Sequence, residues 1–303
     1  MQMTSDSAEP QVSFIMPVWR PHAVWLMTAV RSVLDEVDVA LELIVVDDGN
    51  DAPVRSLLAE VCDPRLRVIE IPHGGPAIAR NAGVAAATGQ YIRFIDADDA
   101  VALGGTQALL RSVGGRSWIA HGVVELCGAE LEVQDVRRAT ECGDAWLCCL
   151  TGGFSIYHPA LLFPRDVVQA AGGWRSRATC EDWDFVLRAL EIAPVEPCPV
   201  VVYRYRRQPN SLSRSTTVAR EAGEAVVREH FERWPEHRGT RIERRANAYL
   251  TQRALHRYGV ESPWRSVAWW RASLHNPAYP LRIVLGGLQR RRQAVWSRVR
   301  RAC

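Results

Sequence analysis

Short apolar runs alternate with helical stretches through the first hundred residues, and this alternation limits the folds open to the chain. Residues 23–37 place apolar residues at three- and four-residue steps, as one face of a helix requires, and Pro53 and Pro76 suit the first turns of two further helices. Strands joined by helices of this length form right-handed crossovers and a mainly parallel sheet. The sequence therefore predicts an α/β fold. The expected strands are residues 12–16, 41–46, 66–71 and 91–95, and the expected helices are residues 23–37, 52–61 and 76–87.

Composition places the chain among ordinary globular proteins. Of its 303 residues, 48% are hydrophobic, which is enough for a sizeable core. The eight cysteines include no CxxC pair and no zinc-finger spacing, which favours reduced thiols. The N-terminus is polar, and no apolar run approaches the roughly 18 residues that cross a bilayer. We therefore expect a cytoplasmic protein.

Acidic side chains gather where two of the predicted strands end. Asp47 and Asp48 end the second strand, and Asp96, Asp98 and Asp99 follow the fourth. Clustered carboxylates repel one another unless a cation lies among them, and Mg2+ is commonly held by one or two carboxylates and substrate phosphates. A solvated turn is the alternative. Because ligands collect beyond the carboxyl ends of parallel strands, where both acidic loops and the loop after the first strand converge, a binding site is favoured.

Four motifs together resemble the inverting family 2 glycosyltransferases with a GT-A fold. They are VSFIMPVW, LIVVDDGN, GGPAIARNAGVAAATGQYIRFIDADD and CEDWDF, in the family's order, within residues 12–215. The segment GGPAIARN lacks the GxGxxG fingerprint, which disfavours a hydride-transferring Rossmann enzyme. The resemblance implies a flexible N-terminus (1–11), a nucleotide-sugar-binding half (12–100), an acceptor-binding half (101–215) and an Arg-rich helical C-terminal extension (216–303).

The resemblance implies that the first two loops hold a nucleoside. Pro17, Val18 and Trp19 would lie against it, with Trp19 next to the base, although a Trp that caps the sheet edge is the alternative. Asp48 would accept a hydrogen bond from N3 of the base, which favours a uridine or thymidine nucleotide, and Asp47 would orient the loop. A UDP-sugar is the expected donor.

The GGPAIARN motif would lie near the diphosphate of that donor. Gly74 and Gly75 would let the backbone approach the nucleotide. Arg80 and Asn81 would either hold the helix start near the diphosphate or brace the acidic loop. For Arg80, the binding role and the structural role are equally open.

Asp96, Ala97 and Asp98 match the DxD motif of the family. Asp96 would contact the ribose or the sugar, Asp98 would bind Mn2+ or Mg2+ between the two phosphates, and Asp99 would support the loop. The leaving nucleoside diphosphate gains negative charge as the glycosidic bond breaks. A divalent ion on its oxygens therefore stabilises the transition state more than the ground state.

Glu181 and Asp182 open a predicted helix and match the acidic pair of the family. The resemblance implies that Asp182 is the catalytic base, which deprotonates the acceptor as it attacks opposite the diphosphate, with inversion. Glu181 would orient the acceptor, and Arg188 would pair with a nearby acid. Acids are also favoured in any first helical turn, so a helix cap is the alternative.

Three further side chains are candidates for contact with the sugar or the acceptor. Trp174 follows two glycines in the segment AAGGWRS, and Trp183 follows the acidic pair, where it also fits a buried helical face. His158 lies in a segment that resembles the floor of the acceptor cleft, but a lone histidine there is more often structural.

One position departs from the family pattern. Many relatives carry a histidine as a further metal ligand where this chain has Gln208, after Arg206 and Arg207. A glutamine carbonyl is a neutral and weaker ligand, so water and phosphate would complete the metal site. The two arginines would alternatively neutralise the diphosphate directly.

The C-terminal extension is basic and helical. Residues 216–303 contain 18 Arg against 7 Asp and Glu, and helices are expected at residues 219–234, 241–258 and 264–274. Residues 281–302 combine seven Arg with an amphipathic pattern, which suits peripheral contact with the inner membrane face. A helical subdomain with a solvated Arg face is the alternative, and a homodimer stays open. No nucleic-acid-binding module is recognisable.

The sequence thus predicts a glycosyltransferase that makes single additions to a discrete acceptor. The acceptor is not identified: a glycan, a lipid-linked sugar, a carrier-bound intermediate and a natural product all stay open. Two other classes of protein remain in view. One is a non-catalytic nucleotide-sugar-binding module, and the other is a protein that attaches to a membrane surface or a partner through the basic tail.

Overall fold

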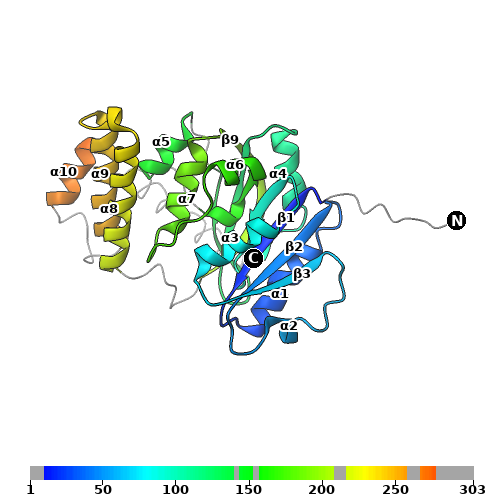
Figure 1. Ribbon diagram of the computed structural model, residues 1–303. Coiled ribbons are helices and arrows are strands. Elements are labelled where there is room, and N and C mark those ends of the chain that lie inside the picture. The colour runs from blue at the N-terminus through cyan, green and yellow to red at the C-terminus, as the bar shows by residue number, and fades with distance from the viewer. Residues whose placement is uncertain (1–9, 140–142, 153–156, 208–215, 258–266, 278–303) are drawn as a thin grey trace, which may run out of the picture. The chain divides into compact units, whose positions relative to one another are not determined.

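The computed structural model describes residues 10–139, 143–152, 157–207, 216–257 and 267–277. The chain forms two compact units, coloured mainly blue to green and yellow to orange in Figure 1. The first unit comprises residues 1–141, 156–177 and 181–209, and the second comprises residues 142–155, 178–180 and 210–303. In the parts of the chain just listed, no helix has the length and apolar character to cross a membrane.

The first unit is built on a mixed sheet. In the described part of the chain, nine strands take the order β3-β2-β1-β4-β8-β6-β9-β5, with β7 paired to β6. Strands β1 to β4 are mutually parallel, as predicted, whereas β8 pairs antiparallel with both β4 and β6. The strands are β1 (Val12–Val18), β2 (Leu41–Asp48), β3 (Leu66–Ile71), β4 (Tyr91–Phe94), β5 (Ala100–Val101), β6 (Ile119–Cys127), β7 (Val133–Arg137), β8 (Leu161–Pro164) and β9 (Val195–Arg206).

Helices cover both faces of this sheet. Phe14 and Met16 of β1 share an apolar core with Leu26 and Val30 of α1, and Ile15 meets α3 at Gly83 on the opposite face. A Cβ at Gly83 would lie 2.3 Å from Ile15 Cγ2, so α3 packs closely only because this residue is glycine. The helices of this unit are α1 (Ala23–Leu34), α2 (Val54–Leu57), α3 (Pro76–Ala86), α4 (Gly105–Val113), η1 (His158–Ala160), α6 (Arg165–Ala170) and α7 (Glu181–Leu190).

Several predicted boundaries differ from the structure: α1 ends at Leu34 rather than at residue 37, and β2 runs to Asp48 rather than to residue 46. Strand β1 continues through Pro17 to Val18 instead of ending before the proline. Because β4 pairs with β1 only as far as Ile15, Pro17 lies beyond the part of β1 that is flanked by two strands. The helix expected at residues 52–61 is the single turn α2, and the chain turns towards β3 after it.

The second unit is helical. It contains α5 (Ala145–Leu150), α8 (Thr216–Arg233), η3 (Pro235–His237), α9 (Arg241–Arg257) and α10 (Val267–His275), and Figure 1 shows α8, α9 and α10 side by side. The three predicted C-terminal helices are therefore confirmed where the structure describes them. The indole of Trp146 packs between His230 and His237, with ring centroids 4.8 and 5.2 Å away.

A buried glutamate holds the amino-terminal ends of the central strands together. Glu42 of β2 is 6% exposed and accepts hydrogen bonds from Ser13 Oγ (2.7 Å), from the backbone and hydroxyl of Thr88 (2.7 and 2.6 Å) and from Arg67 (2.8 Å). Burial by itself raises the pKa of Glu42, but the bonds from Thr88, Ser13 and Arg67 outweigh it and lower the pKa below 4.5. The ionised carboxylate therefore stabilises the fold.

Glu42→Gln should lower the free energy of unfolding at pH 7 by about 2 kcal/mol, since a charged acceptor is lost from a buried network. A folded-state pKa below the unfolded value gives stability that is present above pH 4.5 and lost as pH falls through the folded pKa. Urea unfolding between pH 3 and pH 7 should therefore show the two proteins converging in acid. A difference in free energy of unfolding between the two proteins that stays constant with pH would contradict the role of the ionised Glu42 carboxylate.

Candidate functional site

Three loops converge at the carboxyl edge of the parallel strands. Val18, at the end of β1, lies beside Asp47 of β2 in the strand register, and Phe94, at the end of β4, lies beside Ile15. The loops that follow these strands therefore meet at one edge of the sheet, as the sequence predicts. They carry the residues expected to bind a nucleotide.

Trp19 presents a flat aromatic surface on this edge. Its side chain is 48% exposed, so it is not a buried cap on the sheet. Its ring stacks on His73 with centroids 4.7 Å apart and an interplanar angle of 19°, and the guanidinium carbon of Arg20 lies 4.7 Å from its centre. Val18 is fully buried and Pro17 is partly buried, so of the three residues Trp19 is the one whose side chain is best placed for a ligand.

Asp48 organises the loop before α3. Its carboxylate is 2% exposed and accepts hydrogen bonds from the backbone N–H groups of Gly74 (2.8 Å) and Gly75 (3.0 Å), while His73 Nδ1 lies 3.1 Å away. Gly75 has φ +87°, a conformation that favours glycine. Asp48 therefore shapes the glycine loop, a role that the sequence did not reveal.

Asp47 orients the neighbouring loop, in agreement with its expected role. Its Oδ1 accepts from the backbone and side chain of Asn50, and its Oδ2 accepts from Val54 N at the start of α2. Asn50 in turn donates to the Val18 carbonyl at 2.9 Å. The loop after β2 is thus tied to the end of β1, directly before Trp19.

Arg80 joins Asp96, the first acid after β4, to Glu181, the acid at the start of α7. It is 5% exposed, and its Nη2 lies 2.9 Å from Asp96 Oδ1 while its Nη1 lies 3.7 Å from Glu181 Oε1. Burial alone would raise the pKa of Asp96, but the charge and hydrogen bond of Arg80, with His158, lower it. Arg80 therefore braces the acidic loop, which is one of the two roles expected for it.

Asp99 is held from β9 and supports the acidic loop. It is 1% exposed and accepts from Tyr203 Oη (2.7 Å) and from Arg206 N (2.6 Å), and Tyr203 Oη also accepts from Asp96 N (3.2 Å). Burial, with the charges of Asp98 and Asp96, raises the pKa of Asp99 well above its usual value. Tyr203 is a site residue that sequence reasoning missed, because only pairing through β9 brings it here.

The acidic pair lies in the first turn of α7. Glu181 and Asp182 are both partly exposed, and burial together with the charge of Asp182 raises the pKa of Glu181. Asp182 Oδ1 accepts from Trp183 N at 2.8 Å. The predicted pairing of Arg188 with a nearby acid is confirmed, because its Nη2 lies 2.7 Å from Asp184 Oδ2.

The three expected sugar or acceptor contacts are buried in this structure. Trp174, Trp183 and His158 are 3%, 2% and 6% exposed. Trp174 stacks on Phe185 with centroids 4.4 Å apart, and burial, with the charge of Arg80, lowers the pKa of His158 to about 4. A position next to a site in the sequence does not by itself leave a side chain accessible to substrate. Direct contact of these three residues with substrate stays a prediction.

The two arginines at the end of β9 occupy different environments. Arg206 is 4% exposed, donates to the carbonyls of Asp98 and Ala129, and lies over the ring of Trp25. It therefore holds the acidic loop rather than facing a diphosphate, which differs from the expected alternative. Arg207 is exposed. Gln208 and residues 281–302 lie outside the described residues.

A divalent ion fits this edge only as an ion shared with a substrate. In the described part of the chain, no three His, Cys, Asp or Glu side chains are grouped closely enough to hold a metal. Ala97 and Asp98 are partly exposed, whereas Asp96 is paired with Arg80. Mg2+ is usually held by one or two carboxylates plus substrate phosphates, and that is the donor set available here.

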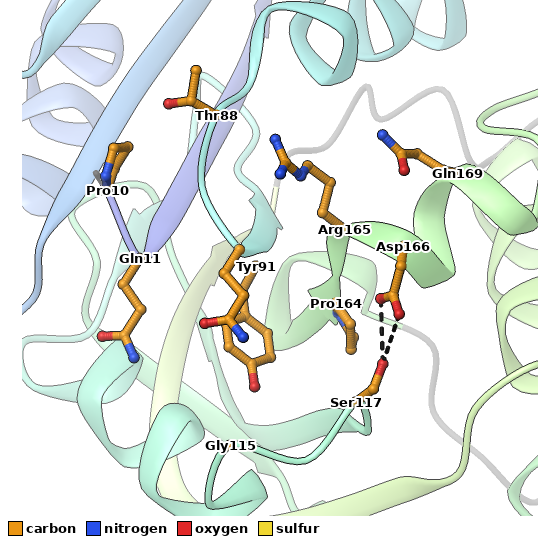
Figure 2. A pocket seen from close by; sticks show the side chains of 11 residues that line it. Pro10, Gln11, Thr88, Tyr91, Gly115, Ser117, Pro164, Arg165, Asp166 and Gln169 are labelled. Carbon is orange, nitrogen blue, oxygen red and sulfur yellow. Dashed lines mark hydrogen bonds between the residues drawn. The ribbon is translucent and has the colours of Figure 1, made fainter. Parts of the chain in front are cut away.

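A hollow of about 520 Å3 opens at the opposite edge of the sheet (Figure 2). Gln11 and Gln90, which precede β1 and β4, line it together with Arg165 and Asp166 at the start of α6. Figure 2 shows Asp166 hydrogen-bonded to Ser117. None of the predicted site residues lines this hollow, so it is not the candidate site.

Comparison with known proteins agrees with this geometry. Residues 13–122 match the family model described as Glycosyl transferase family 2. The succinoglycan biosynthesis protein ExoO of Rhizobium meliloti is 38% identical over 93 residues, covering 30% of this chain and 26% of that protein. The pre-mycofactocin glycosyltransferase of Mycobacterium tuberculosis is 28% identical over 218 residues, covering 67% of this chain and 45% of that protein.

Solved structures show the same fold. TarS residues 1–349 of S. aureus in complex with UDP-GlcNAc has a TM-score of 0.60 and 14% sequence identity, covering 86% of this chain and 79% of that chain. Residues 13–122 are thus similar to the family 2 glycosyltransferases, and the chain has a GT-A fold. The matched segment spans about a quarter of ExoO and under half of the mycobacterial relative.

Tyr203→Phe should test the link between β9 and the acidic loop. Without the hydroxyl, a buried Asp99 oxygen loses its donor, so the free energy of unfolding should fall by about 1–3 kcal/mol, measured by urea denaturation. Tyr91→Phe is the matched control, because it removes a hydroxyl that donates to a neutral carbonyl, that of Arg116, at 3.2 Å. Equal losses of unfolding free energy in the two variants would contradict the view that the Tyr203 hydroxyl holds the acidic loop through Asp99.

Proposed function

We propose that the first unit transfers a sugar from a UDP-sugar to a discrete acceptor with inversion, by a single displacement. The observation that carries the proposal is the bridge by which Arg80 connects Asp96 of the DxD motif to Glu181 of α7. This bridge brings the expected donor acids and the expected acceptor acids into one site. The family match and the fold shared with a UDP-GlcNAc complex support it.

The donor nucleoside would bind at the rim formed by Trp19. The Trp19 indole is 48% exposed and would lie next to the base, and contact with an aromatic side chain is favourable for any base. Asp48 keeps acceptor capacity beyond its bonds to Gly74 and Gly75, because each carboxylate oxygen accepts more than one hydrogen bond. It would read the N3 proton of uracil, which is why a uridine nucleotide is the proposed donor.

The diphosphate would lie between the glycine loop and Asp98. Asp98 would hold Mn2+ or Mg2+ there together with the phosphate oxygens, and such an ion stabilises the charge of the leaving diphosphate. Arg207 is exposed after β9 and is the arginine placed to add a second positive charge. Arg206 serves the loop instead through the Asp98 carbonyl.

The two acids of α7 suit different tasks. Glu181 lies 3.7 Å from Arg80 Nη1 and is partly exposed, and it would orient the acceptor through a hydrogen bond. Asp182 would take the proton from the attacking hydroxyl or amine. The acceptor itself, whether a glycan, a lipid-linked sugar, a carrier-bound intermediate or a natural product, is left to a substrate screen.

A thermal-shift titration tests donor binding. UDP with Mn2+ should raise the melting temperature of the wild type by mass action, whereas GDP and NAD should have little effect. Asp98→Ala should lose most of the Mn2+-dependent part of the UDP shift. A folded wild-type protein that shows no shift with UDP or dTDP would overturn the donor assignment, and UDP binding without product in a donor and acceptor screen would favour a non-catalytic binding module.

Asp182→Asn tests the base. Turnover should fall by at least about a hundredfold, the usual contribution of a general base, while UDP affinity stays within about twofold. Asp166→Asn is a matched control, since Asp166 also lies in a first helical turn and also accepts the N–H of the next residue, at 2.9 Å against 2.8 Å for Asp182. Full activity in Asp182→Asn, or equal losses in both variants, would show that Asp182 only caps α7.

A further inference from the structure

The side chain of Asn81 binds a loop that lies 93 residues away in sequence. Its Nδ2 donates to the Trp174 carbonyl at 2.8 Å, and its Oδ1 accepts from Trp174 N at 2.8 Å. One amide thus satisfies both backbone groups of a single residue, as a neighbouring strand would. Asn81 directly follows Arg80 on α3. The residue that holds this loop is therefore the sequence neighbour of the bridging arginine.

The loop before Trp174 is shaped to approach this amide. Gly172 and Gly173 have φ values of +73° and +65°, which favour glycine. A Cβ at Gly173 would lie 2.6 Å from Asn81 Oδ1, closer than atoms can pack. The two glycines therefore allow the contact, and the contact fixes where the Trp174 indole lies.

The Trp174 indole lies under the Arg80 guanidinium. The guanidinium carbon is 4.4 Å from the ring centre, within the range of a cation–π interaction. The other side of the indole is supported, because Phe185 stacks on it and Phe94 meets it edge-on at 4.9 Å. In the described residues, Arg80 Nε and Nη1 are buried without a hydrogen-bond partner, so the ring adds its attraction for the cation to the ion pairs with Asp96 and Glu181.

Arg80 in turn sets the distance between two acids of the site. It lies 2.9 Å from Asp96 and 3.7 Å from Glu181, which belong to different halves of the first unit. A shift of the indole would tilt the guanidinium and change both distances. The contacts thus run from Asn81 through Trp174 and Arg80 to the two carboxylates.

We infer that Asn81 is a positioning residue for the donor site: its amide sets the Trp174 indole beneath Arg80, which fixes Asp96 against Glu181. The inference rests on the proposed function, because it takes these carboxylates to serve the donor. It does not place Asn81 on the diphosphate, which is the other role open to it from the sequence. Its amide is occupied at both ends by the Trp174 backbone.

A double-mutant cycle tests this inference. Asn81→Ala, Arg80→Gln and the double variant are compared for UDP affinity in the presence of Mn2+, by calorimetry well below each melting temperature. Asn81→Ala should weaken UDP binding about tenfold, within the coupling energies of contacting residues. In the Arg80→Gln background, Asn81→Ala should change UDP affinity by less than about twofold, because Asn81 acts on the donor site through Arg80. Independent effects that multiply would overturn the inference.

Asn276→Ala is the control for a merely structural effect. Asn276 is 1% exposed and its Nδ2 donates to the Thr151 carbonyl at 3.0 Å within the helical unit, so its loss removes a comparable buried bond. It should lower the melting temperature and leave UDP affinity unchanged. An Asn81→Ala protein that behaves in the same way would show that Asn81 only stabilises the fold.

Hydrogen exchange separates this inference from the proposed function, since it needs no nucleotide. Asn81→Ala should speed exchange of the amides around residues 172–176 and also those of Asp96 and Asp99, which follow the Arg80 contact. Faster exchange confined to residues 172–176 would overturn the inference even if UDP binds. Faster exchange at both places with no UDP binding by the wild type would instead overturn the donor assignment alone.

Discussion

The ion pair between Arg80 and Asp96 is the interaction on which the rest of the site depends. Three aspartates within four residues would repel one another at the end of β4, but Arg80 neutralises Asp96, and Tyr203 Oη and Arg206 N both donate to Asp99. The loop therefore carries less negative charge than its sequence suggests. Because a buried guanidinium needs partners as much as the acid does, the pair also ties α3 to the acidic loop.

The sequence predicted those parts of the structure that follow from periodicity. The first four strands and α3 lie within two residues of their expected positions, because apolar spacing reports directly on burial. The motif residues at the ends of β1, β2 and β4 meet at one edge of the sheet, because apolar spacing located these strands and parallel strands end at the same edge. The length of α2 was overestimated, since Pro53 and the apolar residues after it are equally compatible with turns. The helix is a single turn.

Contacts between distant segments could not be predicted in the same way. Tyr203 reaches Asp99 across 104 positions, and only the pairing of β5 with β9 makes this possible. The burial of Trp174 and Trp183 follows from packing around Phe185 rather than from their place beside the motifs. A motif fixes which residues come near a site, whereas packing decides which of them turn towards a ligand and which support it from behind.

The buried Arg93 side chain affects how the first unit unfolds. It is fully buried in β4, and it donates to Thr106 in α4, to the Pro159 carbonyl in η1 and to the Val202 carbonyl in β9. Burial lowers its pKa to about 10, so it stays charged at neutral pH. Separating the half formed by residues 12–100 from the half formed by residues 101–207 would strip this cation of all three oxygens at once. The two halves therefore gain little from opening separately, and a single cooperative transition should carry both.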